Sequence, residues 1–313
     1  MPTTSAGLGW LRIDLHFHSP GSSDFKDRTA SPEEIVAKVK EAGLDAFAVT
    51  DHNTGDWIDR LKVAANREGI VVFSGVEVTV PGGERNVHLL AIFDPSQGTE
   101  KVNDFRAQVL ITVEKRGSTE SLAQFIVNDV IDKICENDGI ALLAHCDSTS
   151  GVTSEMRGQQ RIEIIQNPKL LGAEITNDDT ASFFTGSDQV YKRKLATLKG
   201  SDSHSLAEIG RRATYSKVGP PLITALRQCM YDPDTRIRTN EVPEVRYPTI
   251  RKIEISAGFF TGQIFELHSG LNAILGGKGD GKSLIVEYLR FVFDQPSDIL
   301  EIEKDHVLKS TNY

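Results

Sequence analysis

The first two thirds of the chain alternate short apolar runs with amphipathic segments, and this alternation most constrains the fold. Short apolar runs bounded by turn residues are typical of buried strands, whereas apolar residues at helical spacing are typical of helices. Repeated strand-then-helix units predict an α/β domain with a barrel-like sheet. The expected strands are 11–15, 46–50, 71–74, 87–93, 140–144, 173–176 and 197–199, and the expected helices are 32–42, 57–68, 122–137, 189–195 and 221–230.

Length and composition restrict the class of protein. The chain has 313 residues, of which 39% are hydrophobic and 25% charged, so it can form one large globular domain plus part of another. No apolar stretch approaches the roughly 18 residues of a transmembrane helix, and the three cysteines follow no paired spacing. We therefore expect a cytoplasmic protein with no membrane association and no disulfide.

The net charge of −9 opposes binding of nucleic acid by the molecule as a whole. A polyanion would need a local basic patch, and two stretches of the sequence offer one. A solvated surface is the more common explanation of such stretches. They are Lys192, Arg193, Lys194 and Lys199, and then Arg236, Arg238, Arg246, Arg251 and Lys252.

Six of the eight histidines stand at or just beyond an expected strand. Loops that follow strands form one face of barrel-like α/β domains, so these residues should converge there. Residues two apart in an extended chain point to the same side, which pairs His16 with His18 and Asp202 with His204. Imidazole with carboxylate suits Zn, Mn, Fe or Ni. One such histidine alone is usually a hydrogen-bonded core residue, but six are costly to bury without shared partners. The six are His16, His18, His52, His88, His145 and His204.

The motifs around these histidines resemble those of the PHP superfamily, the polymerase and histidinol phosphatase metallophosphoesterases. In chain order they are Asp14-Leu-His-Phe-His-Ser, Thr50-Asp-His-Asn, Gly75-Val-Glu-Val, Leu143-Ala-His and Gly200-Ser-Asp-Ser-His. The resemblance covers residues 10–231 and implies a distorted (β/α) barrel of seven units. It also implies a site with two or three divalent metals, Mn, Zn or Fe.

The resemblance implies three groups of metal ligands. Glu77 would bridge the first two, and Asp24 stands where many relatives carry a histidine. Asp51 is interpreted as a residue that orients His52, and Cys146 as structural. The groups are His16, His18, Glu77 and Asp202; then Glu77, His88 and His145; and then Asp24, His52 and His204.

Hydrolysis of a phosphoester by metal-activated water is the reaction that follows from this resemblance. The catalytic residues would be His16, His18, Glu77 and Asp202. Arg211, just past His204, is a further catalytic candidate that could bind a phosphate oxygen, as could Arg212. A surface ion pair explains Arg211 equally well.

A glycine-rich run near the end of the chain fits the P-loop pattern Gly-x-x-x-x-Gly-Lys-Ser. It lies between an expected strand over 271–275 and an expected helix over 282–293, after two further expected strands over 253–255 and 263–267. It resembles the P-loop of ATPases of the structural-maintenance-of-chromosomes (SMC) type, with their RecF and RecN relatives. ATP and Mg would be bound by Gly276, Gly279, Gly281, Lys282 and Ser283.

We therefore expect a PHP domain over 1–231, a linker over 232–250 and a partial P-loop ATPase segment over 251–313. Because the chain ends at Tyr313, a truncated fusion is expected, completed by a missing ATPase half or a partner chain. The expected activity is that of a nuclease in DNA processing or phage defence, with nucleic acid as substrate. A phosphatase for small phosphomonoesters and a structural or regulatory module of a DNA-binding ATPase stay open as alternatives, as does an oligomer.

Overall fold

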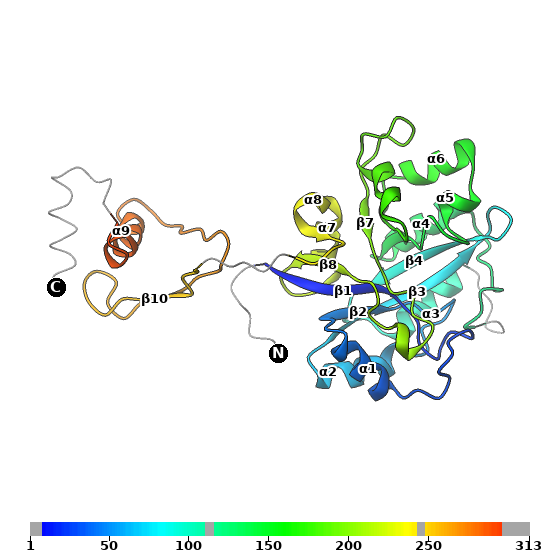
Figure 1. The fold of residues 1–313 in the computed structure, drawn as a ribbon, viewed down its shortest axis with the longest axis horizontal. Helices are drawn as coiled ribbons and strands as arrows, with labels where there is room; N and C mark the ends of the chain where they lie inside the picture. Colours follow the sequence, from blue (N-terminus) through cyan, green and yellow to red (C-terminus); the bar gives the residue numbers. More distant parts are fainter. Residues whose placement is uncertain (1–7, 110–115, 243–247, 296–313) are drawn as a thin grey trace. The chain divides into compact units, whose positions relative to one another are not determined.

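The computed structural model describes residues 8–109, 116–242 and 248–295 (Figure 1). These residues separate into two compact units, one within 8–242 and one within 248–295. Each unit is described by itself.

Within its described residues, the first unit is built on a nine-stranded sheet of order β7-β6-β5-β4-β3-β2-β1-β8-β9. The two outermost strands in this order, β7 and β9, approach each other, so the sheet is nearly closed into a barrel. This confirms the α/β class and the barrel-like sheet. The strands are β1 (Gly9–Phe17), β2 (Ala46–Val49), β3 (Val71–Val80), β4 (Val87–Phe93), β5 (Ile140–Leu143), β6 (Leu170–Glu174), β7 (Ala196–Leu198), β8 (Thr214–Val218) and β9 (Ile237–Arg238).

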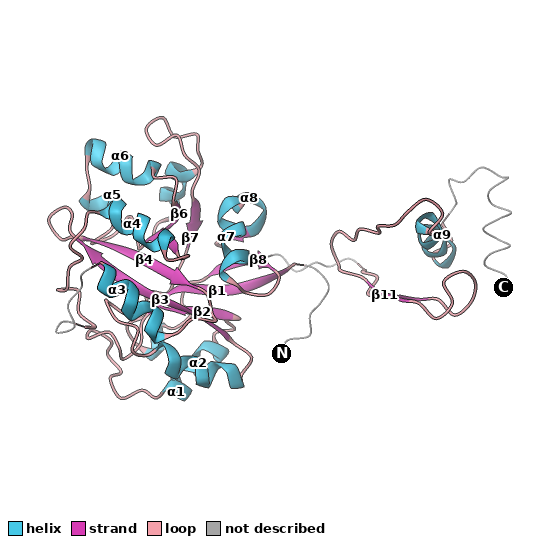
Figure 2. Ribbon diagram, turned by 180° about the vertical axis from the view of Figure 1, so that it is seen from behind, coloured by secondary structure: helices cyan, strands magenta, loops and turns pink. Residues whose placement is uncertain are grey.

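Alternate residues of the strands face two apolar clusters, as the period of a strand requires. On β2, Phe47 and Val49 pack with residues of α1, α2 and α4, whereas Ala46 and Ala48 belong to the cluster that contains Leu226 of α7. Figure 2 shows α7 and α8 beside β8, away from the other helices. The helices are α1 (Pro32–Glu41), α2 (Ile58–Arg67), α3 (Thr99–Gln108), α4 (Val127–Glu136), α5 (Val152–Glu155), α6 (Gly158–Gln166), α7 (Ile223–Tyr231) and α8 (Pro233–Arg236), with 3-10 turns η2 (Asp178–Phe184) and η3 (Leu206–Glu208).

The sheet is mixed, which simple repetition of strand-then-helix units does not predict. β4 runs antiparallel to both of its neighbours, β3 and β5, and β8 runs antiparallel to β1. As a result the start of β4 lies beside the end of β3, where His88 pairs with Thr79.

All seven expected strands of this unit are present, with β3 extended to Val80. The helix expected over 189–195 is wrong, because the chain turns there. The Asp188 carboxylate accepts hydrogen bonds from the backbone amides of Val190 and Tyr191, which stabilises the turn, while Tyr191 and Leu195 are buried in the core. The sequence does not predict α3, α5, α6, α8, β8 or β9.

Part of the stretch expected as a linker is folded. Residues 233–238 form α8 and β9, and β9 pairs with β8 through Arg238 and Tyr215. The sheet therefore continues past the expected limit of the first domain at residue 231, although the division of the chain into domains stays a prediction.

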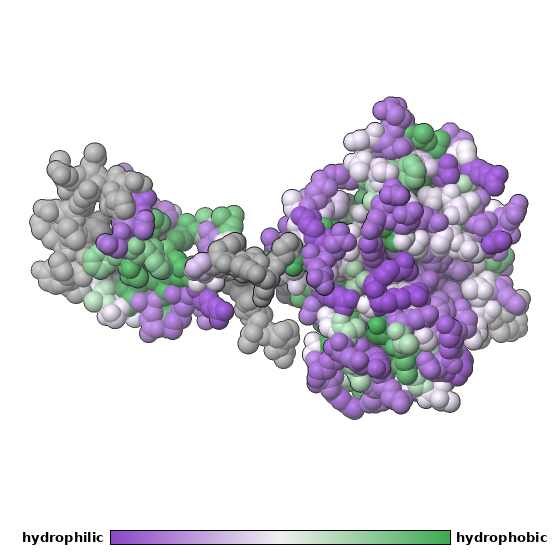
Figure 3. Space-filling view, viewed as in Figure 1, coloured by the Kyte–Doolittle hydropathy of each residue, from purple (hydrophilic) through white to green (hydrophobic). Residues whose placement is uncertain are grey.

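The second unit contains an antiparallel pair, β10 (Lys252–Glu254) and β11 (Ile264–Glu266), followed by α9 (Lys282–Val292). The strand expected over 271–275 is wrong. Leu271 and Leu275 are more than nine-tenths exposed, at 93% and 91%, and no described strand pairs with this segment. Apolar side chains are visible on the surface of this unit (Figure 3). Over the described residues, no helix is long and apolar enough to cross a membrane.

Ser31 is predicted to stabilise the first unit through α1. Its hydroxyl accepts a hydrogen bond from Glu34 N, and its own amide donates to Glu34 Oε2 at 2.8 Å. Replacement of Ser31 by Ala should lower the free energy of unfolding by about 1 kcal/mol, measured by urea denaturation. Ser187→Ala, at an exposed loop position, is the control, and equal losses in both variants would contradict the role of the cap.

Candidate metal centre

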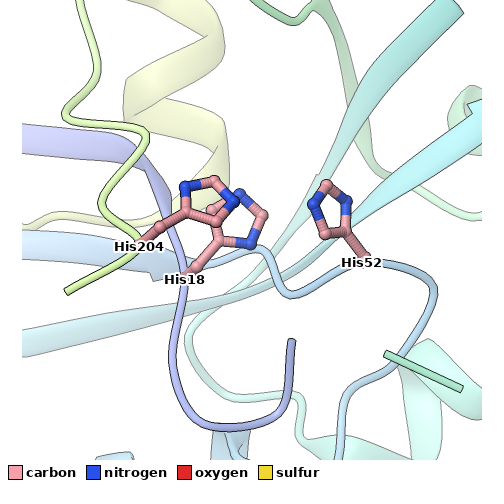
Figure 4. Close-up of side chains that lie close together, drawn as sticks. All are labelled: His18, His52 and His204. Atoms are coloured by element: carbon pink, nitrogen blue, oxygen red, sulfur yellow. The ribbon is translucent and has the colours of Figure 1, made fainter. Parts of the chain in front are cut away.

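The ends of several strands bring the predicted ligands together. His16 lies in β1, His18 and His52 follow β1 and β2, and Glu77 lies in β3. The antiparallel direction of β4 adds His88 from the start of a strand. The remaining residues follow β5 and β7 and are His145, Asp202 and His204. Figure 4 shows His18, His52 and His204, whose rings lie close together although they come from three separate segments.

The first predicted ligand group converges on one space. The Nε2 atoms of His16 and His18 are 3.1 Å apart, as expected for residues two apart in an extended chain. Asp202 Oδ1 lies 3.4 Å from each of these nitrogens. Glu77 Oε1 lies 3.4 Å from His16 Nε2, and Glu77 Oε2 lies 3.4 Å from His18 Nε2. These four side chains could hold one metal ion.

Glu77 is fully buried at the middle of the cluster. Its Oε1 lies 2.8 Å from His88 Nδ1 and 3.2 Å from His145 Nε2, and its Oε2 lies 2.8 Å from His52 Nδ1. Neither oxygen has a partner in hydrogen-bond geometry among the described residues. Burial alone would raise the pKa of Glu77, but the charges of His88, His52 and His16 hold it well below its usual value. A charged carboxylate with two unpartnered oxygens among imidazoles is a donor set that fits divalent metals.

The third predicted group lies at the more exposed side of the cluster. Asp24 Oδ2 is 3.3 Å from His52 Nε2 and 3.1 Å from His204 Nε2. His18 also lies here, because nitrogens of His18, His52 and His204 fall within 4.8 Å of one another. His52 turns one ring nitrogen towards Glu77 and the other towards Asp24, so it stands between the second and third groups.

Glu174, at the end of β6, is a buried carboxylate that the sequence analysis did not single out. Its Oε2 lies 2.6 Å from His16 Nδ1 and accepts a hydrogen bond from His145 N at 2.9 Å. Burial opposes protonation of His16, but the charges of Glu174, Asp202 and Glu77 raise its pKa well above the usual value. Glu174 thus directs His16 Nε2 into the centre. The signal in the sequence was one acidic residue at the end of an apolar run.

Asp51 and Ser22 orient two of the predicted ligands. Asp51 Oδ1 accepts hydrogen bonds from Ser19 N and from the Ser22 hydroxyl, at 2.7 and 2.8 Å. The Ser22 oxygen in turn lies 2.8 Å from His18 Nδ1 and accepts from His52 N. Asp51 is therefore connected to the backbone of His52 by hydrogen bonds through Ser22, as its predicted orienting role requires. Ser22 connects Asp51 to the His18 ring as well.

Arg211 contacts the loop that carries Asp202. Its Nε donates to the Ser201 carbonyl at 2.6 Å and its Nη2 donates to the Asp202 carbonyl at 3.1 Å. Its Nη1 lies 3.5 Å from Glu208, so the ion pair weighed as an alternative is present. A contact of Arg211 with phosphate stays a prediction. Cys146 is fully buried in the apolar core, and burial raises the pKa of its thiol.

The five predicted P-loop residues lie in one turn and the start of α9. Gly279 and Gly281 have positive φ angles of 94° and 79°, which favour glycine. Lys282 donates from Nζ to the Gly276 carbonyl at 2.9 Å, and Ser283 is the second residue of the helix. Their binding of ATP and Mg stays a prediction.

Comparisons with known proteins support the interpretation of the first unit. A family model described as the PHP domain matches residues 14–124. A 5'-3' exoribonuclease of Haemophilus influenzae is 33% identical over 81 residues, which are 26% of this chain and 28% of that protein. A 3',5'-nucleoside bisphosphate phosphatase of Chromobacterium violaceum is 35% identical over 86 residues, 27% and 29% of the two chains. This chain thus spans less than a third of the length of these curated relatives.

Solved structures share the fold. The lesion-specific endonuclease Q of Pyrococcus furiosus superposes with a TM-score of 0.56 at 18% identity, over 72% of this chain and 56% of that one. A complex of endonuclease Q with a 27-mer duplex substrate gives a TM-score of 0.57 at 20% identity, over 72% and 57%. Residues 14–124 are thus similar to the PHP domain, and the solved structures show the same fold. The comparisons give no support to an SMC-like ATPase segment.

Substitution of Glu174 tests whether this residue positions His16 for metal binding. Glu174→Gln keeps the size of the side chain but removes the charge beside His16, and the affinity for Mn or Zn should fall about 10- to 100-fold. The affinity is measured by competition with a chelator of known strength. Glu163→Gln, exposed on α6, is the matched control. An affinity equal to that of the control would mean that Glu174 does not position His16.

Proposed function

We propose that this chain is a metal-dependent phosphodiesterase that acts on polynucleotides, as a nuclease. The observation that carries the proposal is the buried Glu77 carboxylate, whose unpartnered oxygens lie between imidazoles of five histidines. Divalent metals bound at such a site activate water for attack on a phosphoester and stabilise the charge on the leaving oxygen.

The cluster of predicted ligands has a buried side and a solvent-exposed side. His18 and Glu77 are fully buried, so solvent reaches the cluster from the side where Asp24, Asp202 and His204 are partly exposed, at 46%, 24% and 21% of their side-chain surface. A phosphoester would enter from that side. The buried carboxylate of Glu174 keeps His16 fixed from behind.

Several features favour a polynucleotide over the alternatives. A matched relative bears the name of an exoribonuclease, and Asp24 on the open side of the centre is 46% exposed, which leaves room for a substrate larger than the site. A second candidate is a small-molecule phosphatase, because another relative of similar identity is named a nucleoside bisphosphate phosphatase. A structural module remains the third, and the nearly complete donor set argues against it.

The predicted ATP and Mg binding at residues 276–283 is a separate proposal. The sequence motif and the glycine-rich turn before α9 support it, whereas the absence of a strand over 271–275 removes part of the expected context. The nuclease proposal does not depend on it.

Hydrolysis assays separate the three candidates. With added Mn, the chain should cleave bis-p-nitrophenyl phosphate and labelled DNA or RNA, and hydrolyse p-nitrophenyl phosphate weakly. The reverse preference would establish a phosphatase, and metal binding without hydrolysis would establish a structural module. Single-stranded and duplex substrates are compared in the same assay.

His16→Ala should reduce hydrolysis of these substrates at least about a hundredfold, because it removes a donor from the centre. EDTA should have the same effect. His268→Ala, in the second unit, is the matched control. Full activity of His16→Ala, with a circular dichroism spectrum like that of the unaltered chain, would contradict the assignment of the site.

A further inference from the structure

One face of the sheet beside β1 carries alternating aromatic and basic side chains. Trp10 of β1 pairs with Lys217 of β8, Arg12 pairs with Tyr215, and Tyr215 pairs with Arg238 of β9. Directly opposed residues of antiparallel strands share a face. All five are partly or fully exposed, whereas the alternate residues of β8 are buried. We call these five residues the β1–β8–β9 face.

Within the part of the chain that the structure describes, the side chains of the three cations of the β1–β8–β9 face have no carboxylate partner. Arg12 donates to the carbonyls of Ala42 and Gly210, and Arg238 donates to the carbonyl of Asp234 at 2.6 Å. The Lys217 Nζ and Arg238 Cζ atoms lie 5.9 and 5.5 Å from the centroid of the Trp10 ring. Among the described residues none of the three forms an ion pair, so their charge is left for an anion even though the whole chain is acidic.

A cavity of about 590 Å³ continues this face. It shares Arg12 and Tyr215 with the face, and Glu241 is the carboxylate on its wall. Arg212 lines it, and the buried Nε of Arg212 has no hydrogen-bond partner among the described residues. An unpaired buried guanidinium nitrogen is costly, and a phosphate oxygen would satisfy it. The cationic residues of the cavity are Arg12, Lys199, Arg211 and Arg212, of which Lys199 is also paired with Asp178 and Arg211 with Glu208.

Lys199 and Arg238 belong to the basic stretches that stand out in the sequence, but two other residues of the first stretch serve other purposes. Arg193 donates to the carbonyls of Ile165 and Leu170 at 2.9 and 2.6 Å, and thus fixes the segment between α6 and β6. Lys194 is paired with Asp234.

We propose that the β1–β8–β9 face and the adjoining cavity bind a single-stranded segment of a polynucleotide, a proposal that rests on the proposed nuclease function. Bases would stack on Trp10 and Tyr215, and phosphates would be bound by the cations. Stacking rings set among cations on an open sheet are suited to unpaired bases. The β1 strand joins this surface to the metal centre, since Arg12 precedes His16 by four residues, or about 13 Å of strand.

Binding is tested with the whole chain and a fluorescent oligothymidylate, by anisotropy in EDTA so that no hydrolysis occurs. Trp10→Ala should weaken binding about fivefold or more, the effect of losing one stacked base. Lys217→Gln should reduce the slope of log affinity against log salt by about 0.7, the effect of losing one phosphate contact. Phe183→Ala and Arg67→Gln, exposed at 44% and 67% elsewhere in the first unit, are the matched controls.

Unchanged affinity and salt slope in Trp10→Ala and Lys217→Gln would overturn the proposal, as would failure of the unaltered chain to bind. Equal affinity for a duplex of the same length would overturn the preference for single strands. Hydrolysis of bis-p-nitrophenyl phosphate with Mn should stay unchanged in both variants, which shows that the fold and centre are intact. If the unaltered chain does not hydrolyse bis-p-nitrophenyl phosphate, the proposed function is contradicted, but the proposed binding surface is not.

Discussion

The carboxylate of Glu77 is fully buried and lies within 3.4 Å of imidazole nitrogens from five histidines. A buried charge without aligned hydrogen bonds costs several kcal/mol, on the order of the whole stability of a domain. Divalent cations held by Glu77 and the histidines would offset that cost. The proposed chemistry depends on the same residues, because cations held by Glu77 and the histidines would activate water and stabilise the charge that develops on a phosphoester.

The ends of the strands place the predicted metal ligands close to Glu77. The reversal of β4 places His88 beside the end of β3, and β6 ends in Glu174, which fixes the His16 ring. The Ser22 hydroxyl links Asp51 to His18 and His52. The sheet thus positions both the ligands and the groups that orient them.

The sequence predicted that the histidines are metal ligands, because imidazoles at the ends of apolar strands form a local pattern. Glu174 escaped notice because its role depends on a contact with His16, 158 positions away. Local patterns also failed over 189–195, where side-chain capping by Asp188 stabilises a turn, and over 271–275, where no described strand pairs with the segment. The β1–β8–β9 face could not be predicted because its residues come from three separate strands, two of which the sequence analysis missed.

The most direct test of the account is the anomalous scattering of a crystal of the chain soaked in Mn or Zn. The account predicts anomalous peaks on both sides of Glu77, each about 2.0–2.3 Å from one of its oxygens and from histidine nitrogens. A map without such peaks, in which the Glu77 oxygens accept hydrogen bonds from protonated histidines alone, would contradict it.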